Sequence, residues 1–180
     1  MNILAFGASH SSTSINRRFA LYAAQFFKQD NAVETIDLRD FDLPLFTVDL
    51  EASLGHPATI NRFLDKLDWA DFILISMSEH NGSFNASFKN LMDWTSRVKR
   101  DMFNHKPVLL LSTSPGPRGG VGSLQAGEDL ITRFGAKVIN RFSLPQFGKN
   151  FNETDGITEP GLNKQFMEVM RAVKQELNLI

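Results

Sequence analysis

The sequence predicts an α/β protein with a doubly wound, five-stranded parallel sheet and helices on both of its faces. Short apolar segments alternate along the chain with longer segments of helical period, which is the pattern of βαβ units. The apolar segments hold few polar side chains, as expected of strands that helices cover on both sides. The pattern runs evenly over 180 residues without a Ser/Gly linker or a repeat, so we expect one domain over residues 1–180.

Five segments are expected to be strands because each is a short apolar run that ends in loop-forming residues. They are Ile3 to Phe6, Val33 to Leu38, Phe72 to Met77, Val108 to Leu111, and a last one that begins at Val138 to Ile139.

Five segments are expected to be helices because their apolar residues recur with helical spacing. Pro57 and Pro160 each stand where a first-turn proline is tolerated. The predicted helices are Ser14 to Gln29, Pro57 to Trp69, Phe84 to Lys99, Ser123 to Phe134 and Pro160 to Leu177.

Two stretches, Arg39 to His56 and Ser143 to Thr158, have no regular pattern. Stretches of this length are either functional rims or variable surface loops. Ligands of open α/β sheets bind beyond the carboxyl ends of the strands. We therefore expect the chemistry in the loops after the first, third and fourth strands.

The composition excludes several classes of function. The chain has no cysteine, so disulfides, thiolate metal sites and cysteine nucleophiles are ruled out. Its 19 basic and 20 acidic residues nearly cancel and form no basic block, which argues against nucleic-acid binding. No apolar run reaches the ~20 residues of a membrane span, and Met1-Asn2 leads into a strand without a basic leader region. We expect a cytoplasmic protein.

The loop after the first strand, residues 7–18 (GASHSSTSINRR), places five hydroxyl side chains before a predicted helix. A helix N-terminus with hydroxyls and free amides is an anion site. The segment lacks both GxGxxG and the P-loop lysine, so what remains suits a single terminal phosphate. Simple capping of the helix by serine is the alternative.

The loop after the third strand, residues 76–94 (SMSEHNGSFNASFKNLMDW), contains a strong turn signal at Asn81-Gly82. A two-residue hairpin is not expected there, because a helix follows. His80 has no second histidine at metal-ligand spacing, and Glu79 alone is more often a solvated carboxylate. Trp94 is expected to pack in the core.

The loop after the fourth strand, residues 112–122 (STSPGPRGGVG), carries four of the twelve glycines within seven positions. Such a loop permits close backbone approach to something planar or anionic. A flexible turn is the alternative.

Together these loops resemble the NAD(P)H-dependent FMN reductase family, a flavodoxin-like group that includes quinone, chromate and azo-dye reductases. Four motifs carry the resemblance: Ser9, Ser14 and Asn16; Asp37-Leu38-Arg39 through Leu43-Pro44-Leu45; Glu79, Asn81-Gly82-Ser83, Lys89-Asn90 and Asp93-Trp94; and Ser114-Pro115-Gly116 with Gly119-Gly120. The chain departs from the family pattern at Ser11 (arginine), Ser78 (proline), His80 (tyrosine) and Asn85-Ala86 (Pro-Gly).

The resemblance implies an FMN-dependent oxidoreductase that takes hydride from NADPH or NADH and reduces a quinone-like or other small acceptor. It implies a homodimer or homotetramer. Hydride transfer itself requires no acid or base, so we assign no catalytic side chain. Ser9, Ser11, Ser14, Ile15 and Asn16 would hold the FMN phosphate. The flavin ring would lie between Ser78, Glu79, His80, Asn81 and Gly82 on one side and Ser112, Ser114, Pro115, Gly116, Gly119 and Gly120 on the other.

Two other functions remain open from the residues. A flavodoxin-type electron carrier would use the same flavin site without nicotinamide turnover. A phosphate-ester hydrolase would need a nucleophile with a base, and although Ser9 and His10 are adjacent, no oriented Ser, His and Asp set can be assigned.

Overall fold

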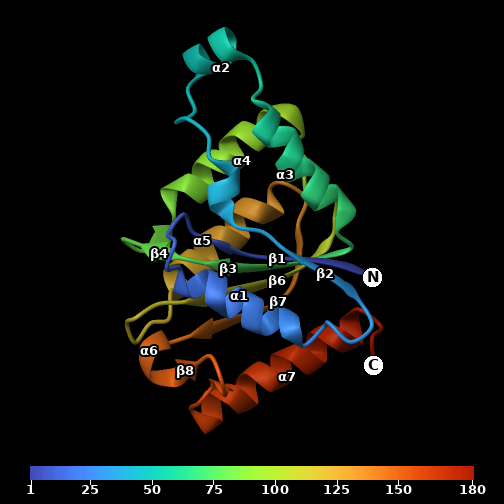
Figure 1. Cartoon of the computed structure of the whole chain (residues 1–180), viewed down its shortest axis with the longest axis vertical. Coiled ribbons are helices and arrows are strands. Elements are labelled where there is room, and N and C mark those ends of the chain that lie inside the picture. The colour runs from blue at the N-terminus through green and yellow to red at the C-terminus, as the bar shows by residue number, and fades with distance from the viewer.

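The computed structural model describes all 180 residues and is built on one five-stranded parallel sheet (Figure 1). The strands lie in the order β2-β1-β3-β6-β7, so the chain starts at an inner strand and winds outward in both directions. Their bounds are β1 Asn2–Ala8, β2 Ala32–Thr35, β3 Phe72–Met77, β6 Pro107–Thr113 and β7 Lys137–Leu144. This confirms the predicted fold class.

Helices cover both faces of the sheet, as Figure 1 shows. One apolar cluster packs α3 (Ala58–Trp69), α4 (Ala86–Val98) and α5 (Val121–Thr132) against side chains such as Phe6 and Ile75. The other packs α1 (Ile15–Gln25) and α7 (Pro160–Glu176) against alternate side chains of the same strands, such as Ala5 and Leu74. The two clusters explain why the strands are apolar on both sides.

The predicted elements exist, but several end elsewhere. The predicted helix to Gln29 ends at Gln25, because the N–H groups of Phe26, Phe27 and Lys28 donate to carbonyls three residues back and tighten the chain into turns. The second strand stops at Thr35, because Asp37 caps a short 3-10 helix, η1 Leu38–Phe41. Strand β6 continues past the predicted end at Leu111 and includes the polar residues Ser112 and Thr113. Apolar periodicity alone does not assign polar residues to a strand.

The two irregular stretches contain short elements that periodicity did not reveal. Residues 39–56 include α2 (Val48–Leu54), a helix with no buried residue. Residues 143–158 include α6 (Phe147–Asn150) and the two-stranded sheet of β8 (Phe151–Asn152) and β9 (Gly156–Ile157). Elements of two to seven residues are too short to show a hydrophobic period.

The expectation of no hairpin after β3 is wrong. Strands β4 (Glu79–His80) and β5 (Ser83–Phe84) pair antiparallel around a two-residue turn, Asn81-Gly82. Both turn residues have positive φ, 53° and 78°, which is the geometry that Asn-Gly favours in a tight hairpin. The hairpin is so short that helix α4 still begins two residues after it ends.

Buried Trp94 is a packing residue, as predicted. Its indole N–H donates to the Pro44 carbonyl at 2.8 Å, and the amide of Asn90 donates to the carbonyls of Leu43 and Pro44 at 3.1 and 3.0 Å. These hydrogen bonds connect the Leu43-Pro44 segment, which precedes α2, to α4. Helix α2 projects from this part of the molecule (Figure 1). None of the helices has the length and apolar character needed to cross a membrane.

Candidate cofactor site

A cavity of about 260 Å³ opens where β1, β3 and β6 end, at the carboxyl edge of the sheet. Eleven of the twelve residues around it are polar or proline, and none is a lysine or arginine. They are Ser9, Ser11, Thr13, Ser14, Ile15, Asn16, Ser78, Glu79, His80, Thr113, Ser114 and Pro115. The three loops singled out from sequence thus meet at one place.

The first wall is the N-terminus of α1. Ser14 is the N-cap, and its hydroxyl oxygen accepts the N–H of Arg17 at 3.1 Å. The N–H groups of Ile15 and Asn16 have no hydrogen-bond partner in the protein, and both residues line the cavity. Two free amides at the positive end of a helix dipole are donors for an anion.

The hydroxyl loop before Ser14 is held by its own side chains. The N–H of Ser11 donates to the Ser9 hydroxyl at 3.3 Å, and the N–H of Thr13 donates to the Ser11 hydroxyl at 3.3 Å. Ser9 is buried, whereas Ser11 is exposed at the rim. The loop therefore offers hydroxyl protons to the cavity while its backbone conformation is fixed by ST-type turns.

Asn16 lines the cavity, but its side chain is engaged in structural hydrogen bonds. Its carbonyl oxygen accepts the Ser76 hydroxyl at 2.8 Å and the Thr113 N–H at 3.0 Å, and its amide donates to the Thr113 carbonyl at 3.0 Å. These bonds tie α1 to the ends of β3 and β6. What Asn16 still offers to a ligand is its main-chain N–H.

The second wall is the loop after β3. The Ser78 hydroxyl donates to the Ala8 carbonyl at 2.7 Å, which joins the ends of β3 and β1. Glu79 is not a free carboxylate: its Oε2 accepts the N–H of Ser123 at 2.9 Å, on the first turn of α5. A Cβ on Gly122 would lie 2.8 Å from the Glu79 carboxylate and from the Gly82 carbonyl, so a glycine there lets the hairpin dock on α5.

The third wall is the loop after β6, which contributes Thr113, Ser114 and Pro115. Buried Ser112 lies beneath it and donates its hydroxyl proton to the Gly119 carbonyl at 2.9 Å. Six predicted cofactor contacts do not line the cavity in this structure: Asn81, Gly82, Ser112, Gly116, Gly119 and Gly120. Asn81 and Gly82 form the exposed hairpin tip, and the glycines shape the loop that carries Ser114.

Two cavity residues, Thr13 and Thr113, were not singled out. Thr13 belongs to the same run of hydroxyl residues as its neighbours, and that run could have included it. Thr113 is the last residue of β6. A predicted strand that included Ser112 and Thr113 would have placed Thr113 at the carboxyl edge of the sheet. No group of three or more histidine, aspartate or glutamate side chains gathers in the molecule as a metal site.

Comparisons with known proteins identify the family of this chain. Residues 1–149 match the profile of a family described as NADPH-dependent FMN reductase. The chain belongs to that family. An NADPH:quinone oxidoreductase of Arabidopsis thaliana is 33% identical over 144 residues, which is 76% of this chain and 72% of the relative. A quinone reductase of Escherichia coli K12 is 31% identical over 106 residues, 59% of this chain but only 55% of that relative's length.

Solved structures share the fold of this FMN reductase family member. The flavoenzyme FerB, an NAD(P)H:acceptor oxidoreductase of Paracoccus denitrificans, superposes with a TM-score of 0.74 over 95% of this chain and 93% of FerB, at 21% identity. The apo form of an NADH:FMN oxidoreductase named EMOB superposes with a TM-score of 0.71 over 97% of this chain and 87% of that one, at 20% identity.

Electrostatics near the first wall set this family member apart from its family pattern. Ser11 supplies no charge where the family has arginine, and the nearest cation on α1, Arg17, is turned away from the cavity toward Asp37, with Nε 3.3 Å from Oδ2. Hydrogen bonds from Arg39 hold the pKa of Asp37 below its usual value, with Arg17 adding to the effect. An anion at the first wall would therefore meet hydroxyls, backbone N–H groups and the helix dipole, with no lysine or arginine among the residues that line the cavity.

Proposed function

We propose that the protein is an FMN-dependent oxidoreductase that takes hydride from NADPH or NADH and reduces a quinone-like or other small acceptor. The observation that carries the proposal is the pair of free N–H groups of Ile15 and Asn16, at the end of a cavity lined by hydroxyls and by no acid other than Glu79. Bound FMN would supply the redox chemistry, and the protein would supply binding and orientation.

Each wall of the cavity has a proposed task. The phosphate would be held by the hydroxyls of Ser9, Ser11 and Ser14 and by the two free amides. The flavin ring would lie between the Ser78 to His80 segment and the Ser114-Pro115 segment. Glu79 would keep the hairpin wall in place through its bond to α5, because its acceptor oxygen already serves the Ser123 N–H. No side chain is needed as acid or base for hydride transfer itself.

The acceptor class is proposed from the relatives, two of which are named as quinone-reducing enzymes. The electron-carrier alternative gains no support from the relatives: a flavodoxin of Pseudomonas aeruginosa shares the fold with a TM-score of 0.54, but at 13% identity this likeness shows the fold alone. The profile match to an NADPH-dependent reductase family favours the enzyme.

Steady-state oxidation of NADPH and NADH by the FMN-saturated protein tests the proposal. With a soluble benzoquinone as acceptor, we expect turnover that depends on both the quinone and bound FMN. An electron carrier would instead oxidise the nicotinamide negligibly and accumulate a stable one-electron-reduced flavin during photoreduction. Either of these results would contradict the proposed activity.

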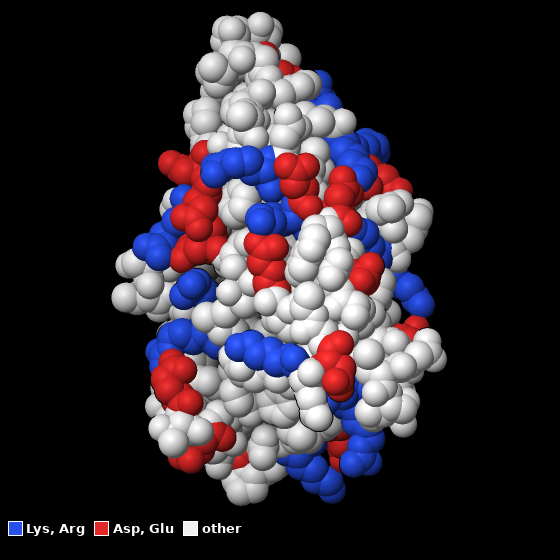
Figure 2. All heavy atoms as spheres, turned by 45° about the vertical axis from the view of Figure 1, so that its right-hand side comes forward, with Lys and Arg blue, Asp and Glu red and all other residues white.

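We also propose that the protein is a homo-oligomer joined through the arm formed by α2 and the residues beside it. Leu45, Val48 and Leu54 are 78%, 70% and 55% exposed. Val48 and Leu54 are the first and last residues of α2, which projects from the body of the molecule in Figure 1, and Leu45 precedes this helix by three residues. The upper end of the molecule in Figure 2 is mostly free of charged atoms, whereas Lys, Arg, Asp and Glu intermix below it. An exposed apolar patch of this kind marks an interaction surface.

Val48→Glu tests the arm. A carboxylate at a buried subunit contact is costly, so we expect the variant to elute as a monomer in size exclusion with light scattering while the parent is a dimer or tetramer. Asp49→Lys is the matched control, because it changes charge on the same helix beside the apolar residues. An equal mass for parent and Val48→Glu would remove the arm as the interface.

We also propose a cytoplasmic location. It fits the proposed activity, because NADPH and NADH are made and used there.

A further inference from the structure

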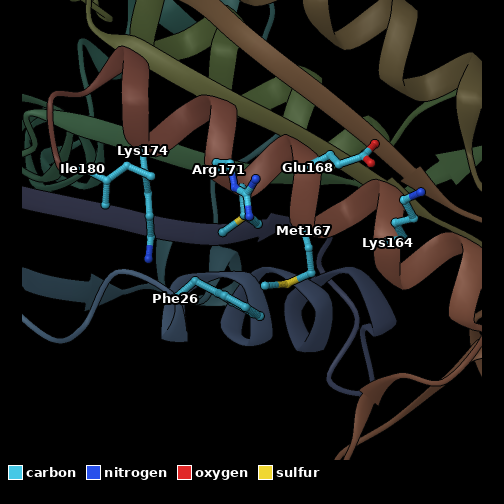
Figure 3. Close-up of a pocket in the computed structure, with 8 residues that line it drawn as sticks. Phe26, Lys164, Met167, Glu168, Arg171, Lys174 and Ile180 are labelled. Atoms are coloured by element: carbon cyan, nitrogen blue, oxygen red, sulfur yellow. The ribbon is translucent and has the colours of Figure 1, made fainter.

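A second concave site lies far from the cofactor cavity, between the C-terminal end of α1 and α7 (Figure 3). Its volume is about 450 Å³, which is within the range of small-molecule sites. Phe26 is the C-cap residue of α1, whereas Ser14 at the cofactor cavity is its N-cap. The helix between them has 11 residues and is thus about 16 Å long, so the two sites are separate.

The floor of this groove is apolar. Phe26 comes from α1 and Met167 and Met170 from α7, and Figure 3 shows Met167 pointing toward Phe26 across the gap between the helices. Met170 is buried, while Met167 is 44% exposed. Methionine side chains are unbranched and polarisable, so they adapt to an inserted aliphatic or aromatic group.

The wall of the groove is cationic. Lys164, Arg171 and Lys174 line it together with one acidic side chain, Glu168, and the last residue of the chain, Ile180. The lining side chains thus carry a charge of +2, in a chain whose side chains sum to −1. None of the three cations has a carboxylate within 4 Å. In Figure 3 the Glu168 carboxylate points away from Phe26, while Lys174 extends down toward the segment of α1.

We propose that this groove binds a small amphipathic anion, with the chemistry of a medium-chain alkyl carboxylate. The carboxylate would pair with Arg171 and Lys174, where a guanidinium can form two parallel hydrogen bonds. The alkyl chain would cover Phe26 and Met167, beneath which Met170 is buried. The combination of a cationic wall and an apolar floor in one concavity matches such a ligand in both charge and polarity.

The charges favour this occupant over larger ones. A second copy of the chain related by a two-fold axis would place the same cationic walls against each other. A membrane surface would need the apolar face of α7 to be free, but Phe166, Met170 and Val173 on that face are buried against the sheet. A small anion meets neither obstacle.

Calorimetric titration of the purified protein with sodium decanoate, below the concentration at which decanoate aggregates, tests the proposal. We expect one decanoate per chain and much weaker binding of the neutral analogue decanol. The double variant Arg171→Gln/Lys174→Gln should bind decanoate at least about fivefold more weakly, since it loses two ion pairs with the ligand. Met167→Asp should weaken decanoate binding by more than about tenfold, because it replaces an apolar side chain of the groove with a carboxylate that repels the carboxylate of the ligand.

The matched control is Arg100→Gln/Arg133→Gln, which removes two exposed, unpaired cations away from the groove and has the same net charge as the double variant. It should bind decanoate like the parent. Circular dichroism and FMN titration should be the same for all variants, which separates this test from that of the cofactor site. Four results would overturn the proposal: no binding of decanoate, equal binding of decanol, equal binding by parent and double variant, or binding to anionic lipid vesicles but not to monomeric decanoate.

Discussion

The two ends of α1 open on two cavities that are built in opposite ways. At the N-terminal end, Ile15 and Asn16 present bare backbone N–H groups among neutral hydroxyls, and no lysine or arginine lines the cavity. At the C-terminal end, Phe26 forms part of an apolar floor beside three cationic side chains of α7. Under the two proposals, oriented backbone dipoles would recognise an anion at one end of α1, and side-chain charge would recognise one at the other.

The largest expected effect comes from adding a charge at the N-terminal end. Ser14→Asp should weaken FMN binding by more than about tenfold, because a carboxylate would face the FMN phosphate with no cation among the cavity residues. The variant should stay folded, because Asp caps a helix as well as Ser and can accept the Arg17 N–H. Flavin fluorescence titration measures the affinity.

Ser14→Thr is the matched control, since it keeps the hydroxyl and the cap and should keep most of the affinity. If Ser14→Asp folds and binds FMN like the parent, the serine is only a cap and the phosphate is bound elsewhere.

A smaller effect is expected at the other end. Phe26→Ala removes a half-buried ring whose centroid lies 5.3 Å from that of Tyr22 and 5.5 Å from that of Phe166. We expect the free energy of unfolding to fall by about 1–2 kcal/mol, less than for a fully buried phenylalanine. The dissociation constant for FMN should change by less than about twofold, which is a difference in binding free energy of less than about 0.4 kcal/mol. Urea denaturation and FMN titration check both; a parallel loss of FMN would mean that the ends are coupled.

The smallest expected effect is on how the free energy of unfolding depends on pH through Asp37, which pairs with Arg17 near the N-terminal end of α1. Hydrogen bonds from Arg39, and then the Arg17 charge, lower the pKa of Asp37 in the folded protein. The ionised carboxyl therefore stabilises the fold above its ordinary pKa, and this stabilisation is lost as the pH falls through the lowered value. Asp37→Asn keeps a cap for η1 but should cost about 1 kcal/mol at neutral pH.

The deficit of Asp37→Asn relative to the parent should shrink as the pH is lowered below the usual aspartate range, as measured by urea denaturation at each pH. Asp40→Asn, on the same short helix but without an ion pair, should show little change at any pH. A deficit of constant size would assign the role of Asp37 to packing.

The N-terminal end could be predicted from sequence because it is local. A helix start, its cap and its free amides lie within a few consecutive residues, and the parallel sheet then brings the ends of β1, β3 and β6 to one edge. The Asn16 side chain could not be assigned in this way, because its partners Ser76 and Thr113 are 60 and 97 residues away in sequence. The same holds for Glu79, whose acceptor role depends on how the hairpin docks on α5.

The groove at the other end could not be predicted at all. Its floor joins Phe26 to residues near 170, and each of those apolar residues has the helical spacing of ordinary core packing. Only the packed structure separates Met170, which is buried, from Met167, which is exposed. In the hairpin, by contrast, the local signal is sufficient: Asn81-Gly82 forms the two-residue turn although helix α4 follows directly.

The most direct test of the account is a pair of titrations of the purified protein, one with FMN and one with riboflavin, followed by flavin fluorescence. The two ligands differ only in the terminal phosphate, so their ratio isolates the free amides and hydroxyls at the start of α1. We predict that FMN binds at least about tenfold more tightly, which corresponds to 1.4 kcal/mol or more. Equal affinity for the two flavins would contradict the assignment of the phosphate to the N-terminus of α1.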